Sequence, residues 1–225
     1  MSRILIVAAH PDDEILGCGG TISKLASNGH EAFTLILGEG ITSRDEKRNT
    51  KLKAPAIKEL KRQAVQANKL IGVKEVFMND FPDNRFDTVS FLDIVKAIEK
   101  AKKKIRPEKI FTHYESDLNI DHQITQKAVI TAARPLPKES VKEILSFEIL
   151  SSTEWNNPQT FVPDTFFDIT STIEDKLAAL SEYKSELRKF PHPRSLKGVR
   201  LNAENWGMKT GVRFAEVFKI VRSLR

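Results

Sequence analysis

Two segments of this 225-residue chain concentrate side chains that bind metals and transfer protons. The first covers residues 10–14 (HPDDE) and the second residues 113–122 (HYESDLNIDH), and together they hold three of the five histidines. His10 and Asp13, an imidazole and a carboxylate three residues apart, converge on one metal ion if the backbone turns between them. His122 can then supply a third ligand from the second segment.

Two nitrogens and one carboxylate oxygen leave a fourth position open, which is typical of a catalytic rather than a structural zinc site. A structural site would normally use cysteines, and Cys18 is the only one in the chain. Asp12 stands next to a ligand and can take a proton from metal-activated water. Asp121, next to His122, can orient an imidazole from outside the ligand set.

The same residues also fit two interpretations without a metal. A His-Pro-Asp-Asp turn can simply begin a helix, where carboxylates cap free N–H groups and favour the dipole. The glycines Gly17, Gly19 and Gly20 suggest a phosphate-binding loop. Their spacing is not G-x-G-x-x-G, however, and three acids directly upstream would repel a pyrophosphate. The pattern therefore favours the metal site.

Each segment follows a short apolar run of the kind that forms a buried parallel strand. Strands are predicted at residues 3–9, 32–37, 75–78 and 109–112, and helices at about 21–27, 57–71, from Ser90 onward with an Asp93 cap, and 124–132. This alternation predicts a three-layer α/β/α domain with a mostly parallel sheet. Ligands of such sheets bind at the carboxyl ends of the strands, where both segments lie.

The alternation loosens after Pro135. Strands are predicted at 144–150 and 165–169, a helix at 173–183 with a Ser171–Glu174 capping box, loops at 38–55 and 190–211, and a strand or helix at 212–222. The chain shows no internal repeat and no linker composition, so residues 1–225 are predicted to form a single domain.

Composition excludes several classes of protein. No run of 18 apolar residues is present, which excludes a membrane span, and the acids from Asp12 onward exclude a secretory signal. The net charge is +6, yet no zinc-finger spacing or RNA-binding aromatic strand accompanies it, so we expect no nucleic-acid partner. A single cysteine suits a reducing compartment, and we expect a cytoplasmic protein. The oligomeric state, including a homo-oligomer, stays open.

The segment AAHPDDEILGCGGTISKLASNGHE resembles the N-terminal signature of the PIG-L/LmbE-like zinc-dependent N-deacetylases, and DLNIDHQ resembles the later histidine motif of that family. LGEGITSR, PHPRS and GVRFAEVF are also similar to family sequences, so the resemblance covers nearly the whole chain. It implies a Rossmann-like, LmbE-like fold. It also implies a hydrolase that removes the N-acetyl group from a small-molecule amino sugar, such as an N-acetylglucosamine conjugate or an activated sugar.

The resemblance also assigns roles to the residues of the motifs. It implies that His10, Asp13 and His122 bind Zn²⁺ and that Asp12 is the general base. Asn119 departs from the family, because many members carry a histidine there; an amide can donate a hydrogen bond to an oxyanion but cannot shuttle a proton. Proton transfer then falls to Asp12 alone, or to Asp12 with help from His113 at the strand end.

Further residues are expected around the substrate, on the resemblance or on their place at the same sheet edge. They are Arg44, Asp83, Asn84, Arg85, His192 and Arg194. Arg44 also fits a solvated loop, and the segment Asp83, Asn84 and Arg85 also fits a plain turn. His192 and Arg194 also fit a brace for the C-terminal segment. Trp155 and Trp206 are predicted to lie in polar loops and fit either sugar-stacking platforms or loop anchors.

Two other functions stay open from the sequence. The first keeps the metal but acts as an amidase or esterase on a non-sugar substrate. The second is a non-catalytic module that binds sugars or nucleotides. Asp12 argues against the second, because pure binding would not need a base beside the ligands.

Overall fold

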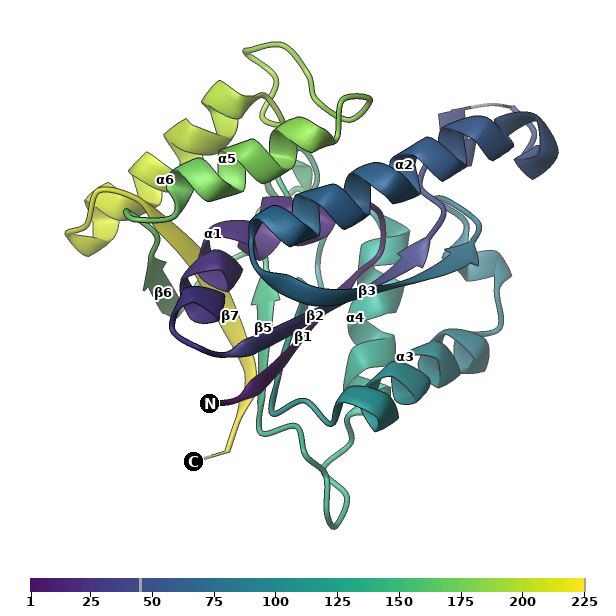
Figure 1. Ribbon diagram of the computed structural model, residues 1–225, viewed down its shortest axis with the longest axis horizontal. Helices are drawn as coiled ribbons and strands as arrows, with labels where there is room; N and C mark the ends of the chain where they lie inside the picture. The colour runs from purple at the N-terminus through teal and green to yellow at the C-terminus, as the bar shows by residue number, and fades with distance from the viewer. Residues whose placement is uncertain (45, 225) are drawn as a thin grey trace.

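A computed structural model describes residues 1–44 and 46–224 and shows a seven-stranded sheet with helices on both faces (Figure 1). The strands are β1 (Arg3–Ala8), β2 (Glu31–Gly38), β3 (Val73–Phe81), β4 (Lys109–His113), β5 (Glu143–Phe147), β6 (Thr165–Asp168) and β7 (Ala215–Ser223). Their order is β3-β2-β1-β4-β5-β7-β6. The first five pair in parallel, and β7 runs antiparallel to both β5 and β6. The predicted three-layer, mostly parallel α/β fold is confirmed.

Helices cover the two faces unequally. They are α1 (Asp13–Ser27), α2 (Thr50–Leu70), α3 (Phe91–Ile105), α4 (Ile120–Ala132), α5 (Ile173–Glu182) and α6 (Leu196–Thr210), with 3₁₀ turns η1 (Thr42–Arg44), η2 (Phe86–Thr88) and η3 (Thr153–Trp155). Figure 1 shows α1, α2, α5 and α6 on one face and α3 and α4 on the other. Within the described ranges, no helix is long and apolar enough to cross a membrane.

The position of β1 in the middle of the sheet explains why the first apolar run contains no polar residue. Ile4, Ile6 and Ala8 pack into the core beneath α1 and α2. Their neighbours Leu5 and Val7 pack into the core beneath α3 and α4. Successive side chains of a strand point to opposite faces, so a strand in the middle of a three-layer fold needs apolar residues at every position. The next residues, from His10 onward, leave the sheet at its carboxyl edge.

Helix α1 begins earlier than the sequence predicts, at Asp13 rather than near Thr21. It bends at Cys18, whose φ of −147° is not helical, so its second half begins as a separate helix. The carboxylate of Glu216 accepts hydrogen bonds from the N–H groups of Gly20 (3.0 Å) and Thr21 (2.6 Å) and caps that second half. The predicted start near Thr21 is therefore the start of the second half, and the first half was missed.

Helix α6 corrects the prediction of a loop over residues 190–211. Ser195 caps its start by accepting from the Gly198 N–H (3.0 Å), and Gly211 ends it at a φ of 77°. Glycines lower helix propensity and hide such a helix from sequence analysis. Gly207 is needed for packing, because a Cβ there would lie 2.5 Å from the Arg213 carbonyl oxygen. The segment that follows is a strand, β7, rather than a helix.

The predicted boundaries differ elsewhere in smaller ways. Helix α2 already begins at Thr50, so the loop predicted over residues 38–55 is shorter and contains η1. Neither predicted capping box forms: Thr172 precedes α5 and its hydroxyl donates to the Gly20 carbonyl (2.8 Å), and Ser90 makes no side-chain cap.

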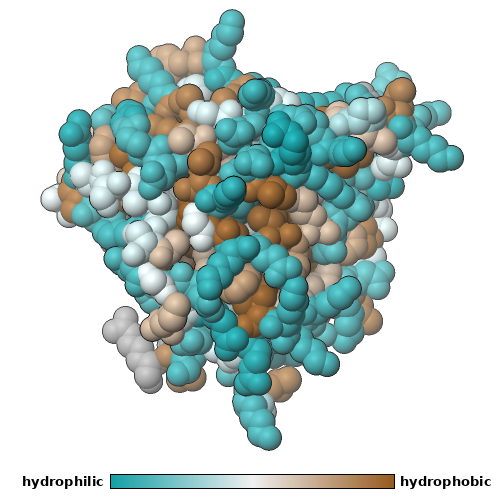
Figure 2. Space-filling model, viewed as in Figure 1, coloured by the Kyte–Doolittle hydropathy of each residue, from teal (hydrophilic) through white to brown (hydrophobic). Residues whose placement is uncertain are grey.

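Strand β3 lies at an open edge of the sheet, between α2 and α3. Figure 2 shows apolar side chains there, enclosed by hydrophilic ones. Phe77 is half-buried, and the ammonium group of Lys104 lies 4.6 Å from the centre of its ring while bonding Glu75 at 2.7 Å. Charged side chains that cover an edge strand in this way hinder its pairing with another chain.

Candidate active site

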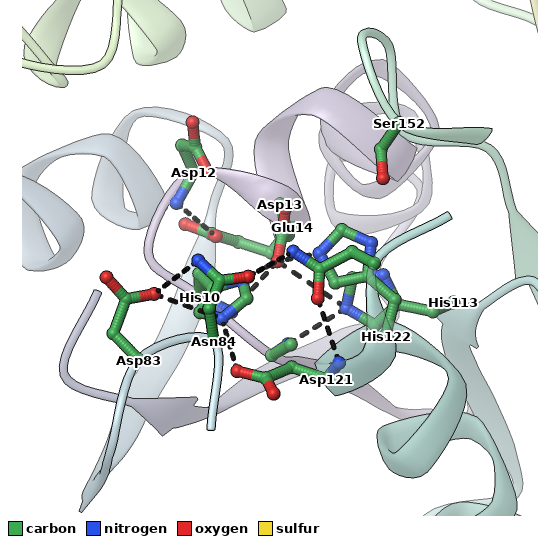
Figure 3. Close-up of polar contacts among 12 residues, drawn as sticks. His10, Asp12, Asp13, Glu14, Asp83, Asn84, His113, Asp121, His122 and Ser152 are labelled. Carbon is green, nitrogen blue, oxygen red and sulfur yellow. Dashed lines mark hydrogen bonds and ion pairs between the residues drawn. The ribbon is translucent and has the colours of Figure 1, made fainter. Parts of the chain in front are cut away.

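The two chemically rich segments meet at the carboxyl edge of the sheet. The turn at residues 10–13 follows β1, and the loop at residues 114–119 connects β4 to α4, which carries His122 near its start. Strands β1 and β4 are parallel neighbours, so their ends lie together. Figure 3 shows the side chains of His10, Asp13 and His122 pointing toward one another.

Ligand atoms of His10, Asp13 and His122 lie within 4.8 Å of one another. The Asp13 Oδ2 atom is 3.4 Å from His10 Nδ1 and 3.3 Å from His122 Nε2. The other Asp13 oxygen and His122 Nε2 are buried and have no hydrogen-bond partner among the residues described. Unpaired buried polar atoms are costly, so this donor set fits a bound metal cation.

His10 is oriented by two carboxylates behind it. Its Nε2 lies 2.9 Å from Asp121 Oδ2 and 3.4 Å from Asp83 Oδ1. With Nε2 directed to this carboxylate pair, Nδ1 faces Asp13 as a free ligand atom. Asp121 thus contacts an imidazole of the cluster, that of His10. Asp83, predicted to lie near substrate hydroxyls, contacts His10 and accepts from the N–H (3.0 Å) and hydroxyl (2.6 Å) of Ser43.

His122 is held from behind by Asp117, which sequence analysis did not single out. His122 Nδ1 lies 3.0 Å from Asp117 Oδ1, and the same carboxylate accepts from the hydroxyls of Ser152 and Thr153 (2.5 Å) and from the N–H of Asn119 (2.8 Å). Burial opposes ionisation of Asp117, but the bond and charge of His122 and the two hydroxyl bonds lower its pKa to about 2. The carboxylate thus stays ionised and fixes the imidazole.

Replacing Asp117 by Asn is expected to destabilise the metal-free protein by about 2 kcal/mol at pH 5–7, since its pKa falls from 3.8 to about 2 on folding. A carboxyl group whose pKa is lowered by folding stabilises the folded protein at pH values above its pKa in the unfolded chain. That stabilisation is lost as the pH falls through its pKa in the folded protein. Urea unfolding at a series of pH values should therefore show that the free energies of unfolding of wild type and Asp117→Asn converge below pH 4. A difference that stays constant down to pH 2.5 would contradict the role given to this carboxylate; exposed Asp87→Asn serves as control.

The ionisable groups of the cluster depend on one another. Burial disfavours the Asp13 carboxylate, but the charge of His122 and the bonds from His10 and His122 hold its pKa well below the usual range. Burial lowers the pKa of His122, while Asp13 and Asp117 raise it to about 9. A metal binding at His122 Nε2 therefore displaces a proton, which makes metal affinity pH-dependent.

Asp12 stands beside the cluster without belonging to it. Its backbone has a φ of 107°, which turns the chain sharply between strand and helix, and its N–H donates to Glu14 Oε2 (3.1 Å). Its carboxylate is 2% exposed and accepts from Arg194 Nη1 at 3.3 Å. Burial raises the pKa of Asp12 well above its usual range, and Arg194 opposes that rise. A carboxylate of this kind can accept and return a proton.

Glu14 supports this turn from below. One carboxylate oxygen accepts from the Asn68 side chain (2.8 Å) and from the Tyr183 hydroxyl, and the other accepts from the Asp12 N–H. Burial raises the pKa of Glu14 to about 7. The sequence contains this residue in its motif but gives no sign of its partners, which come from α2 and from the end of α5.

Arg194 and His192 reach the site from the loop before α6. The Arg194 guanidinium bonds Asp12, and its Nε also donates to the Leu150 carbonyl (3.2 Å) and the Ser151 hydroxyl (2.7 Å). Its backbone N–H donates to His192 Nδ1 at 3.1 Å. Arg194 thus lies against Asp12, the predicted base.

His113 and Asn119 are both engaged by the protein. His113 is fully buried, its Nε2 accepts from the Ala9 N–H (2.8 Å), and its ring stacks on His122 with centroids 4.0 Å apart. Burial lowers the pKa of His113 well below its usual value. Asn119 caps α4 by accepting from the Asp121 N–H (2.8 Å), while its Nδ2 donates to Asn84 Oδ1 (2.7 Å).

The remaining predicted residues lie around the rim. Arg44 is 41% exposed and pairs with Glu186 at 2.5 Å. Asn84 is exposed, adopts a φ of 52°, and bonds Asn119 as described. Arg85 is half-buried, and its side chain contacts no group among the described residues closely enough for a hydrogen bond or ion pair. Of these three side chains, only Arg85 has its polar group unbonded within the described residues.

Comparison with known proteins adds a family to this geometry. Residues 5–133 match the family described as GlcNAc-PI de-N-acetylase (PIG-L). The chain is 28% identical over 188 residues to a probable N-acetyl-α-D-glucosaminyl L-malate deacetylase 2 of Bacillus cereus, covering 82% of this chain and 83% of the relative. It is also 28% identical over 188 residues to a 4-oxalmesaconate hydratase of Pseudomonas putida, covering 78% and 70%. The structure of N,N′-diacetylchitobiose deacetylase from Pyrococcus horikoshii aligns with a TM-score of 0.76 at 23% identity, covering 98% of this chain and 84% of that one.

Proposed function

Because the chain belongs to the PIG-L family, we propose that it is a zinc-dependent hydrolase that removes the N-acetyl group from an N-acetylated amino sugar. The observation that supports this most directly is the placement of Asp12. Its buried carboxylate lies beside a His-Asp-His donor set that has unpaired ligand atoms, without being one of the ligands. Such a pairing of metal donors and a separate base suits hydrolysis of an amide by water.

The three ligands are His10, Asp13 and His122, and zinc bound by them supplies a Lewis acid that acidifies water and polarises the acetamide carbonyl. The protein positions these ligands through Asp121 and Asp117, which fix the two imidazoles from behind. Each imidazole is thus held in one orientation before substrate arrives, which lowers the cost of assembling the site.

Asp12 carries the proton through the reaction. It accepts a proton from the attacking water while a C–O bond forms at the acetyl carbon. It then gives that proton to the leaving nitrogen as the C–N bond breaks, which yields acetate and a free amino sugar. Arg194 holds the carboxylate in place at 3.3 Å and favours its ionised form. Since His113 and Asn119 are engaged elsewhere, Asp12 performs both transfers alone.

A second candidate is the addition of water to an unsaturated carboxylic acid. The hydratase from Pseudomonas putida matches this chain with the same identity, over the same number of residues, as the deacetylase from Bacillus cereus. The same base and donor set would serve that reaction, with the proton going to carbon rather than to nitrogen.

Acetate release decides between the two. Zinc-loaded protein is incubated with N-acetylglucosamine, its glycosides and its nucleotide conjugate, and acetate is measured. In a parallel assay, loss of ultraviolet absorbance reports hydration of 4-oxalmesaconate. We expect acetate from at least one sugar and none from metal-free protein. Hydration without acetate release would replace the deacetylase proposal with the second candidate.

A further inference from the structure

Two loops at the rim of the site are bonded together next to His122. Asp117, after β4, accepts from Ser152 and Thr153, which follow β5. The side chain of Asn156 donates to the Ser116 carbonyl at 2.7 Å. The turn η3, at residues 153–155, is therefore fixed over the histidine end of the site rather than free in solvent.

An apolar side chain projects on each side of this junction. Trp155, the last residue of η3, is 52% exposed, and Leu118, next to Asp117, is 54% exposed. Trp155 stands two residues after Thr153, whose hydroxyl bonds Asp117, the carboxylate behind His122. Leu118 directly follows Asp117. Exposed tryptophan beside buried polar groups is typical of binding surfaces, where one apolar face meets a ligand.

Trp155 contacts the loop that carries Arg194. The backbone N–H of Trp155 donates to the Ser152 carbonyl at 3.3 Å. Its ring meets the His192 ring at 5.7 Å and 74°, while 52% of the residue stays exposed to solvent. His192 is fixed in turn by the N–H of Arg194, whose guanidinium bonds Asp12. A continuous series of contacts thus connects the indole to the proposed base.

The rim has polar groups on another side of the same cluster. Figure 3 shows Asn84 and Ser152 on different sides of His10 and His122. The amide of Asn84 is bonded to Ser43, Asp83 and Asn119, but the neighbouring Arg85 has a guanidinium without a bonded partner in the described part of the chain. A pyranose presents an apolar face of C–H groups and a polar edge of hydroxyls, which matches an indole on one side and a guanidinium donor on another.

We propose that Trp155 is the platform on which the sugar ring of the substrate stacks, so that it selects acetamido sugars over other amides. This rests on the proposed function. Stacking would hold the ring so that its acetamido group points between Asp12 and the metal donors. Trp155 would then determine substrate specificity and take no part in the transfer of the proton.

The chain has two tryptophans, which permits a direct test. Trp206 lies on α6, where its Nε1 donates to Glu148 at 2.7 Å, and Trp206→Phe leaves Trp155 as the only indole. Titrating this zinc-loaded variant with glucosamine, the product of the reaction, should give a saturable change in tryptophan fluorescence. The converse variant Trp155→Phe, which keeps Trp206, should show none.

Kinetics provide the second readout. Trp155→Ala should raise KM for an acetamido sugar about 3- to 10-fold with kcat within twofold, and Trp155→Phe should retain most of the affinity. Cleavage of a small non-sugar acetamide should be unchanged by either substitution. Acetate release from sugars with an unchanged KM and no fluorescence response would overturn the platform and leave the deacetylase standing. Absence of acetate release together with a saturable fluorescence response would overturn the deacetylase but keep the sugar platform, and absence of both would overturn both.

Discussion

Replacing Asp12 by Asn is expected to lower the rate of acetate release by about 10²- to 10⁴-fold and to leave the metal bound. The amide cannot accept a proton from water, while the three ligands remain in place. Asn is the suitable replacement because position 12 has a φ of 107°, a region that asparagine tolerates better than most residues. The measurement is kcat for acetate release together with zinc per chain by elemental analysis.

Asp87→Asn is the matched control, because that carboxylate is exposed on η2 near the same edge of the sheet. It should change neither kcat nor metal content. If Asp12→Asn kept full activity, the base would have to be another group. If it lost zinc instead, Asp12 would be a ligand, and the separation between base and donor set would be wrong.

Replacing His122 by Ala is expected to abolish zinc binding, and acetate release with it. The imidazole is one of three donors, and its loss leaves only His10 and Asp13. In wild type, zinc at about 100 times its Kd should stabilise the fold by about 3 kcal/mol, which for a chain of this size raises Tm by roughly 5–10 °C. In His122→Ala the same addition should leave Tm unchanged.

His113→Gln is the control for the second prediction, because its ring stacks on His122 and accepts from the Ala9 N–H without being one of the three proposed ligands. It should lower Tm and still respond to zinc. If His122→Ala responded as strongly as wild type, the metal would have to use other donors. The group formed by His10, Asp83 and Asp121, whose ligand atoms also lie within 4.8 Å of one another, would then be the next to test.

The core of the site could be predicted because it follows from local sequence and one rule of topology. Residues 10–13 leave β1 and residues 114–122 follow β4, and the ends of parallel strands share an edge. The sequence could not show the second set of contacts. Asp12 and Arg194 are 182 positions apart, and Asp117 and Ser152 are 35 apart. Only the packed chain brings such pairs together.

The errors in the fold have a common cause. Helix α6 contains two glycines, and α1 contains three around its bend, so local propensity argues against helix in both. Tertiary packing decides otherwise: a Cβ on Gly17 would lie 2.4 Å from the Phe147 ring, which shows how closely α1 approaches β5. These glycines allow close approach of the chain, a requirement that a single sequence does not reveal.

The capping of α1 by Glu216 makes the first helix of the chain depend on its last strand. The residue lies on the last strand, and Lys176 bonds it at 2.6 Å while also donating to the Leu16 carbonyl (2.7 Å). A nascent chain that ends at residue 133 already carries every metal ligand and the whole segment matched to the family. It lacks the groups that close the bend in α1 and the arginine that holds Asp12. The order of residues along the chain therefore places the completion of this turn late in synthesis, after residue 216.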